Sequence, residues 1–204
     1  HTENLKYHGI YSSQQAATPQ PTLDHMPGMP FYLYAIFKVV DRESPWAVLP
    51  NLLCGWGILI LLGMILKETG MPEKARLIAL GLYGCIPILD YYALQFYPEV
   101  PAALLTLAGF YALLRLIKDP QIKWAAIAGL LFAVAVFFRP ELILNFAVAG
   151  LALLLARLPA KKIMVYTALM AAILIGLLTP WTIRNYQVSG EFVFLAKNHA
   201  PGTT

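Results

Sequence analysis

The chain has 204 residues, of which 59% are hydrophobic and only 13% are charged, and its formal net charge is +4. Soluble domains average about 25% charged residues, so this chain has too few charges to coat a soluble globule of its size. The composition therefore argues against a soluble enzyme, a disordered tail and a disulfide-stapled module, and it indicates a membrane protein. Nucleic acid is not an expected partner, because no basic run is interleaved with aromatic residues.

Six uncharged runs follow one another along the chain and predict an all-α, polytopic transmembrane bundle. About 20 residues at 1.5 Å each cross the hydrocarbon core, and the first and last runs have that length. The four runs between them are shorter, and their flanking charged side chains would have to reach the interface for each helix to gain a turn. In chain order the predicted spans are residues 44–66, 77–89, 100–114, 124–138, 142–156 and 163–183.

The few charges predict how the bundle lies in the membrane. If successive loops alternate between the two faces, nine of the fifteen Lys and Arg residues fall on one face and eight of the eleven acids on the other. Short cytoplasmic loops are enriched in Lys and Arg, so the basic face is expected to be cytoplasmic. Residues 1–43 and 184–204 are then outer loops, and residues 44–183 form the transmembrane region.

The first outer loop is rich in Tyr, Pro and His and contains a predicted interfacial helix. Pro27 and Pro30 favour a turn before the aromatic run 31–40. Tyr and Phe in this number are typical of a helix that lies along the membrane at headgroup depth. The alternative is a surface loop that leads into a lipid-facing helix.

Glu99 lies in the outer loop between the second and third predicted spans, just before Pro101. Proline favours the first turn of a helix, and a carboxylate there is stabilised by the helix dipole. The same carboxylate is also suited to bind a metal ion or to contact a polar substrate at the membrane surface. Both interpretations are open at this point.

Arg139, Pro140 and Glu141 alone separate the fourth and fifth runs, which predicts a tight hairpin at the outer interface. Charged side chains at membrane depth are costly unless they are paired or face a polar cavity. One interpretation is a local pair between Arg139 and Glu141. The other is an arginine that faces a phosphate, because the planar guanidinium matches phosphate oxygens.

The last span ends in Trp181 and Arg184, on the face where few basic residues are expected. Trp181 is explained as an interface anchor, whereas Arg184 is either a topology charge or part of a site. Residues 190–195 are predicted to form a short strand. The sequence carries no nucleotide-binding, hydrolase or zinc-binding motif.

Five short motifs occur in an order that resembles a family of membrane enzymes. They are His8-Gly-Ile-Tyr-Ser12, Met26-Pro-Gly-Met-Pro30, Tyr97-Pro-Glu99, Phe138-Arg-Pro-Glu141 and Pro180-Trp-Thr-Ile-Arg-Asn-Tyr186. The series resembles the membrane glycosyltransferases of the C fold, in particular the bacterial relatives of protein O-mannosyltransferase and of the lipid A aminoarabinose transferase. The resemblance extends over nearly the whole chain.

The resemblance implies specific roles. Glu99 matches an acid that assists catalysis or holds a metal, so Glu99 is the candidate catalytic residue and a candidate ligand of Mg²⁺ or Mn²⁺. The family's catalytic base is expected just upstream of His1. The position usually held by Arg or Lys before the Pro-Gly turn is His25 here. The candidate substrate-binding residues are His25, Tyr11, Arg139, Arg184 and Asn185.

The function expected from this resemblance is transfer of a sugar from a polyprenyl-phosphate donor to a lipid, protein or glycan acceptor. The reaction is expected on the outer face of the bacterial cytoplasmic membrane. The alternative is a polytopic transporter or flippase of a lipid-linked or polar substrate. A transporter should carry charges or broken helices at the bilayer centre, whereas the acids and arginines of this chain gather at span ends.

Overall fold

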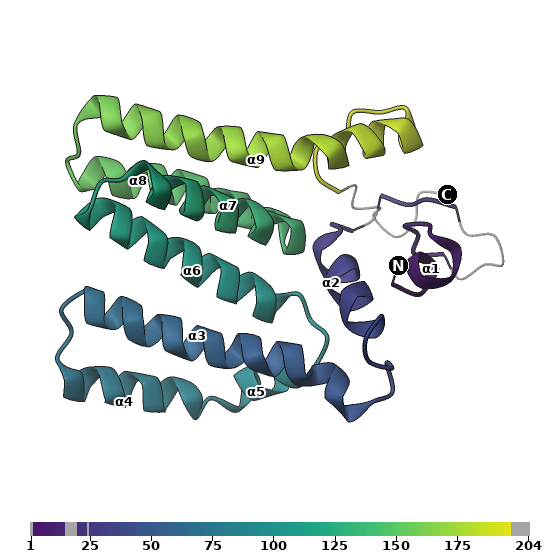
Figure 1. Ribbon diagram of the computed structural model, residues 1–204, viewed down its shortest axis with the longest axis horizontal. Coiled ribbons are helices and arrows are strands. Elements are labelled where there is room, and N and C mark those ends of the chain that lie inside the picture. The colour runs from purple at the N-terminus through teal and green to yellow at the C-terminus, as the bar shows by residue number, and fades with distance from the viewer. Residues whose placement is uncertain (1, 15–19, 24, 197–204) are drawn as a thin grey trace.

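The computed structural model describes residues 2–14, 20–23 and 25–196, and within them it contains helices and no strand. The helices run back and forth between two ends of an elongated bundle (Figure 1). In chain order they are α1 (Thr2–His8), α2 (Gly28–Phe37), η1 (Pro45–Val48), α3 (Leu49–Glu68), α4 (Glu73–Gly84), α5 (Pro87–Leu94), α6 (Glu99–Lys118), α7 (Ile122–Phe138), η2 (Pro140–Ile143), α8 (Leu144–Leu155) and α9 (Ala160–Ser189). The predicted all-α bundle is confirmed.

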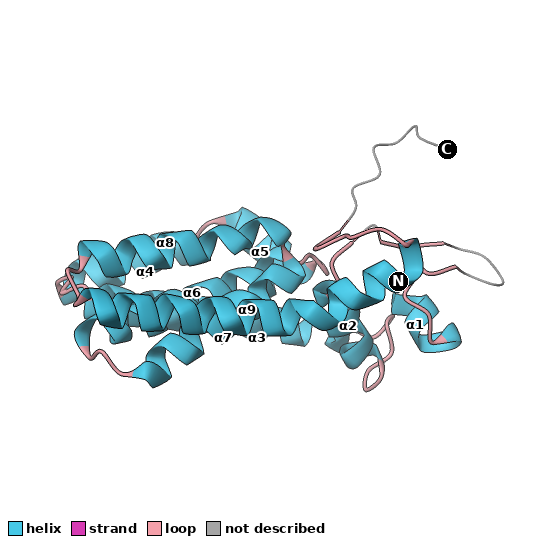
Figure 2. Ribbon diagram, turned by 90° about the horizontal axis from the view of Figure 1, so that it is seen from above, coloured by secondary structure: helices cyan, strands magenta, loops and turns pink. Residues whose placement is uncertain are grey.

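One end of the bundle, here called the α2 end, carries α1 and α2 (Figure 2). The start of α6, the end of α7 and the end of α9 lie at the same end (Figure 1). The loops that follow α3, α6 and α8 gather at the opposite end. The chain reversals therefore alternate between the two ends, as the charge argument assumed.

Within the described part of the chain, three helices are long and apolar enough to cross a membrane. They are Pro45–Glu68, Glu99–Lys118 and Ala160–Ser189. The second of these extends the predicted 100–114 run to 20 residues by adding turns that carry charged side chains. Ile122–Phe138 and Pro140–Leu155 are apolar helices of fewer than 18 residues.

The predicted span 77–89 is wrong as a single helix. α4 ends at Gly84, Ile86 is extended, and α5 begins at Pro87. Proline has no N–H for the helix ladder and disfavours a helical conformation in the residue before it, so a helix cannot pass smoothly through this position. Neither half is long enough to be a candidate span.

The core is organised around α7, which packs against both α6 and α9. Phe132 of α7 is fully buried, and Leu116 of α6, Leu153 of α8 and Met170 of α9 lie in the same cluster. Glycines allow these helices to approach closely. A Cβ on Gly129 would lie 3.0 Å from the Cα atom of Met170.

A second cluster joins the end of the bundle to the segments before α2. Tyr11 and Met26 pack there against Val136 of α7 and against Leu178 and Trp181 of α9. The predicted helix at 31–40 is observed three residues earlier, as α2, because Pro30 is accommodated in the first helical turn.

The predicted strand at 190–195 is wrong. Gly190 adopts a left-handed conformation, with φ of 71°, and ends α9. The residues that follow fold back as a loop whose backbone carbonyls bond to side chains of α9 rather than to a neighbouring strand. Alternating apolar residues cannot form a strand without such a partner.

We predict that Gly129→Val destabilises the bundle by about 1–3 kcal/mol, because the added side chain meets the backbone of α9. Gly176→Val in α9 is the matched control, since no atom lies within 4 Å of a Cβ at that position. Apparent melting temperatures in detergent should fall clearly more for the Gly129 variant. Equal shifts would contradict the close packing of α7 on α9.

Candidate functional site

The charged centre of the α2 end is an arginine held between two carboxylates. Arg139 directly follows α7 and precedes Pro140, so its backbone is extended and the helix ends there. Its Nη1 donates to Oε1 of Glu99, the first residue of α6. Its Nε donates to Oε1 of Glu141 at 2.5 Å. The local pair with Glu141 is therefore observed, and Glu99 joins it from another helix.

This cluster combines one positive with two negative groups. The carboxylate of Glu141, through its hydrogen bond, raises the pKa of Arg139 above its ordinary value, with a further contribution from Glu99. Arg139 therefore stays charged at any physiological pH. Because both carboxylates contact the same guanidinium, an incoming anion would have to compete with them for it.

Glu99 has one oxygen in use and one without a hydrogen-bond partner. Oε2 of Glu99 is buried and makes no hydrogen bond within the part of the chain that the structure describes. A buried carboxylate oxygen without a donor is unfavourable, so this atom is suited to accept a proton or a hydrogen bond from a bound molecule.

Two pockets flank the pair of Glu99 and Arg139. Glu99 lines a pocket of about 560 Å³ between α3, α5 and α6, whose other walls include Trp56 and Tyr92. Arg139 lines a second pocket of about 460 Å³, together with His25 and Met29. Glu99 and Arg139 thus form one ion pair but line two different pockets.

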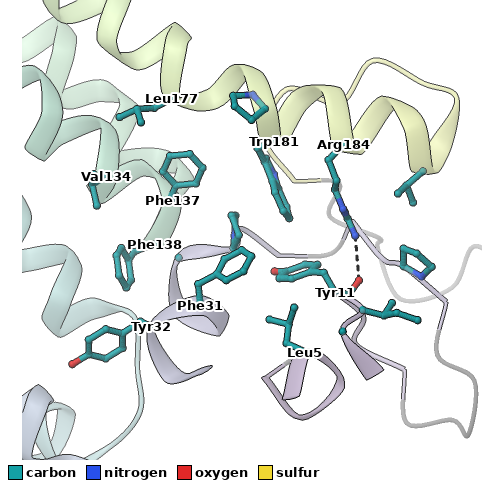
Figure 3. Close-up of a pocket in the computed structure, with 17 residues that line it drawn as sticks. Leu5, Tyr11, Phe31, Tyr32, Val134, Phe137, Phe138, Leu177, Trp181 and Arg184 are labelled. Carbon is teal, nitrogen blue, oxygen red and sulfur yellow. Dashed lines mark hydrogen bonds between the residues drawn. The ribbon is translucent and has the colours of Figure 1, made fainter. Parts of the chain in front are cut away.

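A third and larger pocket of about 1030 Å³ lies between α2, α7 and the end of α9 (Figure 3). Its walls are mainly aromatic and aliphatic, with Phe31, Phe137 and Trp181 among them. It adjoins the His25 pocket, since Phe138 lines both. Among the described residues that line it, Arg184 carries the only charged side chain.

Arg184 holds the segment before α2 against α9. Its Nη1 donates to the carbonyl of Thr22 at 2.9 Å and its Nη2 to that of Tyr11 at 3.1 Å. The guanidinium also lies 5.1 Å from the ring centre of Tyr11 and 4.9 Å from that of Trp181. The hydroxyl of Tyr11 continues the connection by donating to the carbonyls of His25 and Met26.

Asn185 is fully buried beside Arg184 and faces the fold rather than a pocket. Its Nδ2 donates to the carbonyls of Val193 and Leu195, and Nε1 of Trp181 also donates to Leu195. Asn185 lines none of the three pockets described above. Its contacts fasten the loop after α9.

The predicted site residues therefore fall into two neighbouring groups at one end of the bundle. Glu99 and Arg139 form the ion pair, and His25 lines the pocket beside Arg139. Tyr11 and Arg184 meet at the large pocket. Sequence reasoning missed Asn51 of α3 and Tyr32 of α2, which contact residues next to the ion pair in the chain, the turn at Gln95 and Phe138. The signal available for Asn51 was its position as the one amide in the uncharged run 44–66.

The acids at this site do not by themselves form a metal centre. Among the described residues no three His, Cys, Asp or Glu side chains are grouped so that they could hold a metal ion. Glu99 and Glu141 are instead turned towards Arg139. A divalent cation bound by Glu99 stays a prediction.

The fold and the site together define a helical integral-membrane protein with a charged centre at one end of its spans. A family model for dolichyl-phosphate-mannose-protein mannosyltransferases matches residues 24–183. The chain belongs to this family and is a membrane glycosyltransferase of the mannosyltransferase type. No curated protein and no solved structure matches it in the corresponding comparisons.

We predict that Arg184→Lys loosens the segment before α2, because lysine cannot reproduce two hydrogen bonds and two ring contacts at once. The loss should be about 2 kcal/mol, the range of hydrogen bonds to charged groups. Hydrogen exchange of peptides that include Tyr11 and Thr22 should accelerate. Arg76→Lys at the opposite end is the control, and equal exchange in both variants would contradict this role of Arg184.

Proposed function

We propose that this chain transfers a sugar from a polyprenyl-phosphate donor to a hydroxyl group of an acceptor, at the α2 end of the bundle. The acceptor is a lipid, protein or glycan, and the α2 end faces outward from a bacterial cytoplasmic membrane. Family membership supports the transferase chemistry. The observation that carries the assignment of the site is the Glu99–Arg139 pair, with its free carboxylate oxygen between two pockets.

Glu99 is the residue proposed to act on the acceptor. Arg139 fixes Oε1, which leaves Oε2 to accept the proton of an acceptor hydroxyl that enters the 560 Å³ pocket. The hydroxyl oxygen then forms a bond with the anomeric carbon of the sugar, and the bond between that carbon and the phosphate oxygen breaks. The electron pair of the broken bond stays on the phosphate, which departs as polyprenyl phosphate. A positioned base in such a step contributes about 10²–10⁴-fold in rate.

Arg139 and His25 are proposed to receive the donor phosphate in the pocket that they share. A guanidinium binds phosphate oxygens in a planar, two-pronged geometry, and it stabilises the negative charge that develops on the leaving group. The phosphate would displace Glu141 from Arg139, because both compete for the same donors. The adjoining 1030 Å³ pocket offers an apolar surface for the polyprenyl chain, with Tyr11 and Arg184 among its lining residues.

Asn185 supports this donor site through the loop that it fastens. A divalent cation held by Glu99 stays a prediction, and the mechanism proposed here does not depend on one. The base that the resemblance predicts upstream of His1 is the alternative to Glu99 as acceptor of the hydroxyl proton. Transport is the less supported function, because the charged residues of the described site sit at helix ends rather than in mid-span.

We predict that Glu99→Gln lowers sugar transfer by at least about 100-fold in the intact protein, because the amide cannot take up the acceptor proton. Release of dolichyl phosphate from dolichyl-phosphate mannose in membranes measures the reaction. Glu43→Gln removes an acid from the same end of the bundle, outside the three pockets, and is the matched control.

Both variants should be inserted in the membrane in wild-type amounts. Turnover near the wild-type rate in Glu99→Gln would remove Glu99 from the site. A similar loss in Glu43→Gln would show that the effect is one of surface charge and not of the Glu99 carboxylate.

A further inference from the structure

Asn51 is a buried amide at the start of an otherwise apolar spanning helix. It lies in the first turn of α3 and is 1% exposed. An amide buried in such a place is costly unless its polar atoms have partners. Both ends of this side chain have one, and the two partners belong to two other elements of the α2 end.

The first partner is the turn that leads to Glu99. Nδ2 of Asn51 donates to the backbone carbonyl of Gln95 at 2.6 Å. Gln95 ends α5 with an extended backbone, and three residues then connect it to Glu99 at the start of α6. Phe96 in this connection packs edge-on against Phe37 of α2, with ring centres 5.5 Å apart. The turn is therefore held from both α3 and α2.

The second partner is Tyr32 of α2. Its hydroxyl donates to Oδ1 of Asn51 at 3.0 Å. The ring of Tyr32 meets that of Phe138 edge-on, with centres 6.0 Å apart, and Phe138 directly precedes Arg139. Burial raises the pKa of Tyr32, so the phenol stays protonated and remains a donor.

The position of α2 on α7 is itself narrowly determined. A Cβ on Gly28 would lie 2.5 Å from the carbonyl oxygen of Phe137, so only glycine allows this approach. Tyr32 lies one turn further along the same helix. The close contact at Gly28 therefore keeps the ring of Tyr32 against Phe138, and its hydroxyl within reach of Asn51.

We propose that Asn51 is a positioning residue that sets the Glu99–Arg139 pair for reaction. One of its hydrogen bonds holds the turn that carries Glu99, and the other holds the tyrosine that packs beside Arg139. The inference rests on the proposed function, because it assigns Asn51 a role only if Glu99 and Arg139 act in sugar transfer. Misplacement of reacting groups by about 1 Å costs on the order of 100-fold in rate.

The test uses Asn51→Leu, which removes both hydrogen bonds, and Tyr32→Phe, which removes one and keeps the ring. Tyr166→Phe is the matched control, because it deletes a tyrosine hydrogen bond of 2.6 Å to the carbonyl of Pro120 in the loop after α6, at the opposite end. The intact protein is assayed with dolichyl-phosphate mannose as the probe. Hydrogen exchange of residues 95–99 is measured in the same preparations.

We expect Asn51→Leu to lower kcat by about 10-fold to 100-fold while the KM for the donor changes less than about twofold. Tyr32→Phe should lower kcat by a smaller factor. Exchange at residues 95–99 should accelerate in Asn51→Leu and stay at the wild-type rate in Tyr166→Phe. Tyr32→Phe carries the kinetic test if Asn51→Leu fails to fold.

The proposal is overturned if kcat is unchanged in Tyr32→Phe and in folded Asn51→Leu, or if exchange at residues 95–99 does not change in Asn51→Leu. It is also overturned if Tyr166→Phe causes the same loss of kcat, since the effect would then be general destabilisation. Normal turnover in Glu99→Gln would instead contradict the proposed function. The exchange rates would still decide in that case whether Asn51 holds the turn.

Discussion

The ion pair between Glu99 and Arg139 is the contact on which the α2 end depends. A charged group at the end of an apolar helix is stabilised by a partner of opposite sign. Here each charge supplies the other's partner, and the pair joins the beginning of α6 to the end of α7. Because α7 also packs against α9, the pair lies where the ends of three helices meet.

The surroundings of the pair explain how one site can serve two substrates. The acid opens onto a pocket walled by α3, α5 and α6, whereas the arginine opens onto a pocket walled by α2 and the turn at Pro140. In the proposed reaction, an acceptor and a donor would approach from different sides and meet at the ion pair. The other conspicuous arginine, Arg184, is committed to backbone carbonyls and aromatic rings. Its main effect is therefore to hold the walls of the apolar pocket in place, rather than to offer a positive charge to a ligand.

Hydropathy predicted the helices well because uncharged runs have few alternatives in a membrane, where every backbone polar group must be bonded within the protein. Hydropathy gave the wrong helix boundaries where an apolar run contained a residue that interrupts the helical backbone, such as proline. Pro87 breaks the predicted span 77–89, although the run is apolar throughout. The strand predicted at 190–195 does not form, because its carbonyls accept hydrogen bonds from Asn185 and Trp181. The alternation of apolar and polar residues in this segment does not reveal those partners.

The site was predictable in part for the same reason. Charges are scarce in this sequence, so Glu99 and Arg139 were conspicuous, and the family motifs pointed to both. Their direct pairing was not predictable, because the two residues come from different helices, 40 positions apart in the chain. The role of Arg184 depends on Tyr11 and Thr22, which are more than 160 positions away. The role of Asn51 likewise depends on Tyr32 and Gln95, which lie in other elements.

A double-mutant cycle on the intact protein tests most directly whether Glu99 and Arg139 act as one unit. The rate of dolichyl phosphate release is measured for Glu99→Gln, for Arg139→Gln and for the two together. If the pair acts as a unit, the double variant should be about as slow as the slower single variant, because either change already disables the site. If the two losses multiply, the residues act independently and the proposed site is wrong.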